Sequence, residues 1–402
     1  MSSTVNSETQ TYIVVLKDGI STQTFLASLH AHSESFKTFS ADAVHTYEDV
    51  LNGFCGTFNQ NQAEAFEAHP DVKYIEKDAV GEIFAQQNNA PWGLGRLSRI
   101  SPFPISTKPL PNKFFYFYDY PAGKGVDIYI VDTGIDTSHP SFEKRALWGK
   151  TFAGTPNKDL NGHGTHVAGT AISKLYGVAK TATAIAVKIG DDGFNNSTLI
   201  RALDWIISSV RNTKRPSVVN LSIGAAQSRA IDDSVEKLFR AKIPVVAAAG
   251  NSNKDAKTIS PARSPFAITV GASNIQDKRY TLSNYGSVVN VFAPGEEIDS
   301  TWLNGRNSVL SGTSMAAPHI SGLLACLISP ESNIPLNFWA YVHAGKLSNI
   351  PANTPNLLAY NCFYNLGGFI HVQKTVEGEA DDNSTCTEDA PDNTKHDVIG
   401  EA

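Results

Sequence analysis

The sequence predicts an α/β protein with a mostly parallel sheet covered by helices on both faces, preceded by a small α+β domain of the ferredoxin-like type. Between residues 125 and 361, short β-branched runs of strand length alternate with stretches of helical period, as in parallel strands joined by crossover helices. Before them, residues 11–85 show the order strand, helix, strand, strand, helix, strand. With 402 residues, 41% of them hydrophobic, the chain can bury both cores.

The small domain follows a polar N-terminus, residues 1–10. Each of its elements has a local signature: an apolar run, a helical spacing of apolar residues, or an Asn-Gly turn between two strands. We expect strands at 12–16 and 72–76, a strand pair within 45–58, and helices near 25–36 and 63–66.

The large domain is introduced by residues 86–120, which are rich in Gln, Asn and Pro and predict an exposed connector. Strands and helices should then alternate, with the functional site at the carboxyl ends of the strands. We expect strands at 126–131, 184–189, 217–221, 243–247, 266–270 and 288–292, and helices at 197–210, 234–242 and 314–328.

The net charge of −6 comes from one segment. Residues 362–402 hold nine acidic residues against two lysines, which predicts an acidic tail that is unstructured, above all from Glu377 on. The rest of the chain is close to neutral, so no basic surface for nucleic acid or an acidic membrane is expected. No apolar run reaches the length of a membrane span, and residues 1–10 lack the apolar core of a secretory signal.

A first candidate for chemistry is Asp132-Thr-Gly, which directly follows an apolar run. The carboxylate of Asp132 is therefore expected at the carboxyl end of a strand, and Gly134 allows a tight turn behind it. An aspartic protease would need a second Asp-Thr-Gly segment in a β-rich chain, and the sequence has none.

Two histidines open a helical run in the segment His163-Gly-Thr-His-Val-Ala-Gly. A zinc-binding helix needs two histidines four residues apart and an intervening glutamate, and neither condition is met. We therefore expect no metal here. His163, at the helix start, is the better candidate for a general base, and His166 is expected to be a packing residue.

Ser314 begins an apolar helix, where unbonded N–H groups and the helix dipole favour a developing oxyanion. A serine hydroxyl is a weak nucleophile without an adjacent base, which His163 can supply while Asp132 holds its tautomer. Asn251 follows another strand, and its side-chain amide can join the Ser314 N–H in binding the oxyanion.

Three segments in the order Asp, His, Ser resemble the motifs of the subtilisin-like serine proteases: Asp132-Thr-Gly, His163-Gly-Thr-His-Val-Ala-Gly and Gly312-Thr-Ser-Met-Ala. Further segments are similar to the proteinase K-like group of that family: residues 89–94, 176–180, 283–288 and 356–361. The resemblance implies a serine endopeptidase with Asp132, His163 and Ser314 as its triad and Asn251 as an oxyanion donor.

The resemblance also implies how substrates are held. A substrate strand should pair with Leu221-Ser222-Ile223-Gly224, so that a protein or peptide binds by adding a strand. Opposite this segment, Ala248, Ala249 and Gly250 are small, which leaves room for a large apolar side chain before the cut. Broad specificity is therefore expected.

The domain order implies a zymogen. Residues 11–85 resemble the inhibitory propeptide of the family, so the chain's own propeptide is expected to inhibit the peptidase domain, residues 86–361, until self-cleavage near Phe84, Ala85 or Gln86. The relatives of this group are mostly secreted, and sequons for glycosylation stand at Asn195, Asn196 and Asn383. We expect a monomer in an extracellular setting, although no signal peptide is visible.

Two departures from the group concern cysteines and calcium. The disulfides of secreted relatives are not expected, because the cysteines follow another pattern: Cys55, Cys326, Cys362 and Cys386. A calcium site of the group uses carbonyls at Pro265 and Ala267 and a carboxylate where this chain has Asn290, so a structural calcium ion is an open question. No cofactor is required for the chemistry.

Two other readings stay open on the sequence alone. A catalytically silent homologue could act as a binding protein, although all four catalytic positions are intact. Alternatively, the first domain could act in trans as an inhibitor of other proteases. Inhibitor-sensitive hydrolysis of an unstructured protein would separate the enzyme from both.

Overall fold

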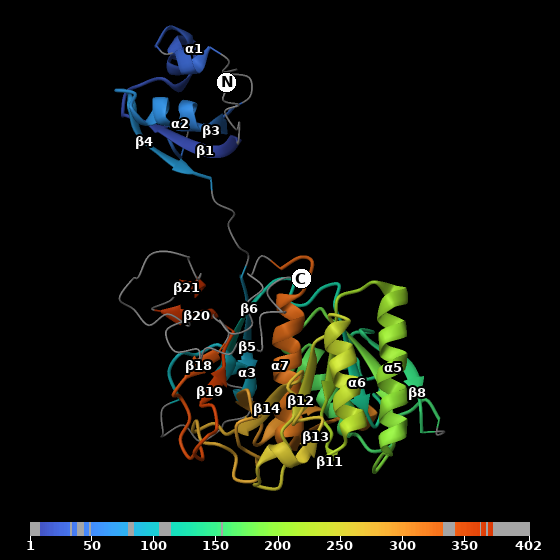
Figure 1. Cartoon of the computed structure of the whole chain (residues 1–402). Coiled ribbons are helices and arrows are strands. Elements are labelled where there is room, and N and C mark those ends of the chain that lie inside the picture. The colour runs from blue at the N-terminus through green and yellow to red at the C-terminus, as the bar shows by residue number, and fades with distance from the viewer. Residues whose placement is uncertain are drawn as a thin grey trace, which may run out of the picture. The chain divides into compact units, whose positions relative to one another are not determined.

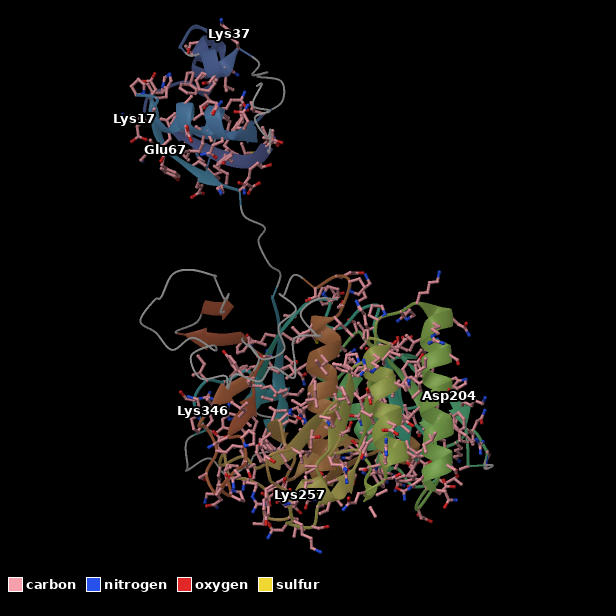
Figure 2. The ribbon with its side chains drawn as sticks, viewed as in Figure 1. Lys17, Lys37, Glu67, Asp204, Lys257 and Lys346 are labelled. Atoms are coloured by element: carbon pink, nitrogen blue, oxygen red, sulfur yellow. The ribbon has the colours of Figure 1, made fainter. Side chains whose placement is uncertain are left out.

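In the computed structural model, the described residues are 9–32, 34–37, 44–47, 50–78, 84–103, 114–153, 156–332, 342–361, 363–366 and 369–372. They fall into two compact units, Met1–Glu82 and Ile83–Ala402, and each is considered by itself (Figure 1). Charged side chains such as Lys17 and Glu67 in the first unit, and Asp204 and Lys257 in the second, are exposed (Figure 2).

The first unit has the expected ferredoxin-like order around a four-stranded antiparallel sheet, β2-β3-β1-β4. Asn59 starts its second helix with a capping box, in which its side chain accepts from the N–H of Gln62 while Gln62 bonds back to the Asn59 N–H. The elements are β1 (Thr9–Leu16), α1 (Thr22–His32), η1 (Glu34–Phe36), β2 (His45–Tyr47), β3 (Gly53–Asn59), α2 (Gln60–Glu67) and β4 (Val72–Lys77).

Aromatic rings fill the core of the first unit. The ring of Phe66, on α2, lies 4.6 Å from that of Phe36, 4.9 Å from that of Phe58 and 5.5 Å from that of Phe54, measured between ring centroids. All four residues are buried, so the helix is held on the sheet by apolar area and ring packing.

The second unit is built on a nine-stranded sheet in the order β18-β19-β15-β14-β12-β10-β7-β9-β8. All neighbouring pairs are parallel except β18 and β19. Its elements through the last parallel strands are β5 (Phe84–Ala90), α3 (Trp92–Leu97), β6 (Phe114–Asp119), β7 (Asp127–Asp132), η3 (Pro140–Phe142), β8 (Ala146–Thr151), α4 (His163–Ile172), β9 (Thr183–Lys188), α5 (Asn196–Thr213), β10 (Ser217–Leu221), β11 (Ala225–Ala226), α6 (Arg229–Arg240), β12 (Val245–Ala248), η4 (Ala256–Thr258), β13 (Ile259–Ser260), β14 (Ile268–Ser273) and β15 (Val291–Pro294). The remainder are β16 (Ile298–Thr301), η5 (Leu303–Gly305), β17 (Asn307–Leu310), α7 (Thr313–Leu327), β18 (Val342–Ala344), β19 (Leu357–Ala359), β20 (Phe363–Leu366) and β21 (Phe369–Val372).

Helices cover both faces of this sheet, as predicted. Side chains of β7 alternate between the two faces: Ile128 and Ile130 join the apolar cluster of α4 and α7, whereas Tyr129 and Val131 join that of α5 and α6. From β7 the chain passes to β8 and then β9 on one side of β7, and β10 follows on the other side, so the direction in which strands are added reverses beside β7. A site is expected at such a switch point, outside the carboxyl end of the strand.

The predicted exposed connector, residues 86–120, is corrected by the structure in its described parts, 86–103 and 114–120; residues 104–113 lie outside the described residues. Strands β5 and β6 pair antiparallel, and all residues of α3 between them are buried. The composition was misleading because a few apolar residues, Trp92, Leu94 and Leu97, carry this segment into the core despite its polar neighbours.

The predicted acidic tail is described only in part. Strands β20 and β21 pair antiparallel near its start, which the charge count alone did not predict. Residues 373–402, including Asn383 and Cys386, lie outside the described residues. In the part of the chain that is described, no helix is long and apolar enough to cross a membrane.

Candidate active site

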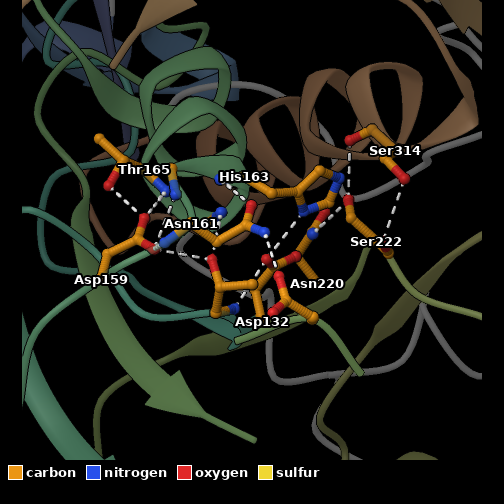
Figure 3. Close-up of polar contacts among 12 residues, drawn as sticks. Asp132, Asp159, Asn161, His163, Thr165, Asn220, Ser222 and Ser314 are labelled. Atoms are coloured by element: carbon orange, nitrogen blue, oxygen red, sulfur yellow. Dashed lines mark hydrogen bonds and ion pairs between the residues drawn. The ribbon is translucent and has the colours of Figure 1, made fainter. Parts of the chain in front are cut away.

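Three residues that the sequence singled out lie at the ends of secondary-structure elements, at one edge of the sheet. Asp132 is the last residue of β7, His163 the first of α4 and Ser314 the second of α7. Asp132 is two residues beyond Ile130, so its side chain points to the face covered by α4 and α7. One strand and the two helices on that face therefore supply all three side chains (Figure 3).

The pair formed by Asp132 and His163 is a direct hydrogen bond of 2.8 Å between Oδ1 and Nδ1. The same oxygen accepts the N–H of Thr133 at 2.8 Å, and Asp132 is only 2% exposed. The close approach of α4 to the end of β7 requires a glycine after His163. A Cβ at Gly164 would overlap the carbonyl oxygen of Gly134 and lie 3.1 Å from the Cβ of Asp132.

Two opposing effects set the pKa of His163. Burial alone would lower it, because the charged imidazolium loses water. The negative charge of Asp132 and its hydrogen bond outweigh burial, and the charge of Asp159 adds to them, so the pKa of His163 lies above its usual 6.5. The histidine is thus suited to accept a proton and then hold it as a cation.

Ser314 is held by a reciprocal pair of hydrogen bonds. Its Oγ donates to the carbonyl oxygen of Ser222 at 3.0 Å, and the Oγ of Ser222 donates to the carbonyl oxygen of Ser314 at 2.8 Å (Figure 3). The Nδ2 of Asn220 donates to the Ser222 Oγ at 2.9 Å, and the Oγ of Ser321 donates to the Asn220 Oδ1 at 2.8 Å. A hydroxyl has one proton, so Ser314 must turn from Ser222 before it can donate to the imidazole.

Asn251 is oriented by the residue before Ser314. Its Oδ1 accepts both the N–H of Thr313 at 2.8 Å and the Oγ1 hydroxyl of Thr313 at 3.0 Å. With the oxygen so used, Nδ2 remains as the donor for an incoming oxyanion. A Cβ at Gly312, whose φ is +151°, would lie 3.0 Å from this Nδ2, so glycine keeps the approach to the amide open.

The expected substrate-binding residues lie at the ends of two adjacent strands. Leu221 ends β10 and pairs with Ala247 of β12, so 221–224 and 248–250 leave the sheet side by side. Leu221, Ala248 and Ala249 are buried, Ile223 and Gly250 are partly buried, and Gly224 is exposed. The side chain of Leu221 is therefore not available to a substrate.

The remaining predicted positions lie elsewhere. Phe84, Ala85 and Gln86 belong to β5 and pair with Asp119, Tyr118 and Phe117 of β6. Asn195 and Asn196 are exposed at the start of α5. His166 is buried, and its Nε2 bonds to the carbonyl oxygens of Ile298 and Ser308, while burial lowers its pKa to about 4; it is a neutral packing residue in this structure.

The donor set for a calcium ion does not fit one well. The Oδ1 of Asn290 already accepts the N–H of Thr269 at 2.7 Å, and a neutral amide replaces the carboxylate that a hard cation prefers. Among the described residues, no group of three or more His, Cys, Asp or Glu side chains is arranged to hold a metal ion.

Comparison with known proteins decides the family, because residues 123–347 match the subtilase family and residues 11–83 match the peptidase inhibitor I9 family. The chain belongs to the subtilase family. Proteinase R from Parengyodontium album is 43% identical over 87% of this chain and 88% of its own length. A cuticle-degrading protease from Metarhizium anisopliae is 39% identical over 87% of this chain and 89% of its own.

A solved structure supports the same assignment. The crystal structure of a cold adapted subtilisin-like serine proteinase superposes with a TM-score of 0.61 at 35% identity, covering 68% of this chain and 99% of that one. This subtilase is therefore a serine endopeptidase with an inhibitor-type propeptide domain, as the sequence predicted.

The sequence motifs did not reveal every polar residue of the site. Asp159, Thr133 and Asn220 are placed at it only by the structure, and Ser222 was expected to bind substrate rather than to hold Ser314. Position gave one hint, because Asp159 and Asn161 stand just before the histidine motif.

Proposed function

We propose that this subtilase cleaves peptide bonds through an acyl-enzyme formed on Ser314, with His163 as general base and Asp132 as its partner. The observation that carries the proposal is the 2.8 Å bond from the buried Asp132 to Nδ1 of His163, at the sheet edge where α7 presents Ser314. That bond leaves Nε2 of His163 for the serine proton.

The chemistry follows from these positions. Ser314 turns toward His163 and attacks the peptide carbonyl as its proton moves to Nε2. Asp132 stabilises the resulting imidazolium, which then protonates the leaving amine, and water repeats the sequence to release the acid. The oxyanion would be bound by Asn251 Nδ2 and by the N–H of Ser314, which lies in the first turn of α7 where no helical carbonyl accepts it.

Substrates are proposed to be proteins and peptides in extended form. The segment 221–224 would pair with the substrate backbone, and the small residues 248–250 would admit a large apolar side chain before the cut. This arrangement supports broad specificity, because backbone pairing does not depend on side-chain identity.

The intact chain is proposed to be a latent zymogen whose own I9 domain is the inhibitor, with self-cleavage near Phe84, Ala85 or Gln86. This segment is paired with β6 in the structure, so we propose that it leaves that pairing before Ser314 cleaves it. We further propose a secreted, monomeric enzyme without nucleic-acid or membrane partners, with Asn195 and Asn196 exposed enough to carry sugars.

The test is hydrolysis of an unstructured protein by wild-type chain, with and without a serine-directed covalent inhibitor, beside Ser314→Ala. We expect about a 10⁶-fold loss of kcat and an unprocessed N-terminus in Ser314→Ala. Ser208→Ala, an exposed serine on α5, should cleave like wild type. Absence of any inhibitor-sensitive cleavage by wild type would favour a silent homologue, and identical N-termini in wild type and Ser314→Ala would overturn self-processing.

A further inference from the structure

A second buried carboxylate stands beside the proposed triad. Asp159 is 1% exposed, yet none of its partners is a cation: it accepts five hydrogen bonds from neutral donors (Figure 3). Its Oδ1 accepts from Thr133 Oγ1 at 2.9 Å, Asn161 N at 3.0 Å and Gly162 N at 2.9 Å. Its Oδ2 accepts from the N–H of Thr165 at 3.0 Å and from its hydroxyl at 2.6 Å.

These donors lie on the two segments that carry Asp132 and His163. Thr133 follows Asp132 directly, and its Oγ1 also accepts the N–H of Gly164 at 2.9 Å. Thr165 lies two residues after His163, and its Oγ1 also accepts the N–H of Asp136 at 2.8 Å. Each hydroxyl thus donates to Asp159 and accepts from the opposite segment, which joins the two segments through one carboxylate.

The loop before His163 has further attachments. Lys188, on β9, donates to the carbonyl oxygen of Lys158 at 2.7 Å, and Asn161 accepts the N–H of His163 at 3.1 Å. Every one of these partners donates to Asp159, so both of its oxygens serve as acceptors. The ionisable groups that act on the His163 imidazole are then Asp132 on β7, Asp159 in the loop and His166 on α4.

We infer that Asp159 is a positioning residue for the triad: its carboxylate fixes the turn into His163 against the residue that follows Asp132, and adds a second negative charge near the imidazole. This inference rests on the proposed function of His163 as the base. Acting through other groups, Asp159 should alter proton transfer rather than substrate affinity.

The first test is Asp159→Asn, which keeps the shape but presents an NH₂ group, so a backbone N–H that faces this group loses its acceptor. We expect kcat to fall about 10- to 100-fold with little change in KM, because small misplacements of reacting groups carry costs of that size. The acid limb of the kcat/KM profile should move to lower pH, because the second negative charge is gone.

The matched control is Asp127→Asn. Asp127 is also buried, at 4% exposed. It is the first residue of β7, the strand that ends with Asp132, and Arg215 Nε donates to it at 2.9 Å. A loss of structure alone would affect both variants alike. Equal kcat values and equal acid limbs in the two variants would overturn the inference.

A second pair of variants covers the case in which Asp159→Asn does not fold. Thr133→Val keeps the branched shape without the hydroxyl, and Thr133→Ser keeps the hydroxyl. We expect the valine variant to lose kcat and the serine variant to restore it. Similar kcat values in both would contradict the inference.

The deciding measurement does not need activity. In histidine-labelled full-length Ser314→Ala chain, NMR titration gives the pKa of His163, identified among eleven histidines by its absence in His163→Gln. Adding Asp159→Asn should lower this pKa, and adding Asp127→Asn should leave it in place. An unchanged pKa in Asp159→Asn would refute the role of Asp159, whereas failure of wild type to cleave protein would refute only the proposed function.

Discussion

The two units of this chain are stabilised in different ways. Among the described residues of the first unit, the buried polar side chains are Gln62 and His69, and the core is a single apolar cluster. The second unit buries full charges in addition to its apolar clusters: Arg96, Asp127, Asp132, Asp159, Lys188 and Asp277.

The difference between the two units shows which buried charges have a structural or a catalytic use. Removing a charge from water costs several kcal/mol, so each such group must be matched inside the protein. Arg96 and Asp277, which are far apart in the sequence, form an ion pair with two hydrogen bonds of 2.7 and 2.9 Å that joins α3 to a loop. Asp132 and Asp159 are matched by histidine and by neutral donors instead, which leaves net negative charge where an imidazolium would form.

The largest effect should come from removing one of those charges. Asp132→Asn keeps the shape of the site but favours the wrong tautomer of His163 and removes its main counter-charge. We expect kcat to fall about 10⁴-fold, and the residual acid limb to shift to lower pH. Steady-state kinetics from pH 5 to pH 9 test this, with Asp204→Asn on the surface of α5 as control. A loss of less than tenfold would contradict the assignment.

A change of apolar volume should dominate in the first unit. Phe66→Ala removes the ring at the centre of the aromatic cluster, and we expect about 3–5 kcal/mol of destabilisation confined to that unit. Hydrogen exchange on full-length Ser314→Ala chain measures protection in both units separately. Phe66→Leu should lose much less. Equal loss of protection in both units would show that they unfold together.

The second unit should also be the more acid-sensitive. Burial lowers the pKa values of His166 and His319 to about 4, against 6.5 when exposed. Because these imidazoles are buried in the neutral form, their contribution to the free energy of unfolding is complete above pH 6.5. As the pH falls toward 4, the free energy of unfolding decreases by up to about 3 kcal/mol for each. The raised pKa of His163 acts in the opposite sense. Urea unfolding at pH 7, 5.5 and 4 measures the slope, which His166→Gln should reduce; an unchanged slope would count against burial as its cause.

The smallest effect is expected from metal chelation. Because Asn290 brings no charge and already accepts from Thr269, EDTA should leave the Tm of the second unit unchanged. Asn290→Asp supplies the missing carboxylate and serves as the comparison. A fall of several degrees on adding EDTA to wild type would restore the calcium site.

The fold could be predicted because its signals are contained in short stretches of sequence. Strand and helix periods appear within a few residues, and the motifs around Asp132, His163 and Ser314 place each at the end of an element. The family comparison confirmed the subtilase assignment, while the roles of these residues remain predictions. The bond of Asp159 to Thr133 joins two segments that only the folded chain brings together, so no spacing rule reveals it.

The misread connector has a similar cause. Composition counts the many Gln, Asn and Pro residues of 86–120 equally, but apolar side chains such as Trp92, Leu94 and Leu97 decide burial. Likewise, the amide of Asn251 was predicted as a donor, but its orientation depends on Thr313, which is far away in the sequence.

The alternation along β7 has a consequence for how activity responds to errors in assembly. Asp132 faces α4 and α7 only because it is in phase with Ile128 and Ile130. A slip of one residue would turn the carboxylate to the other face and leave no half-working arrangement between the two. Activity recovered after refolding should therefore be proportional to the fraction of molecules with the correct strand register, each of them fully active.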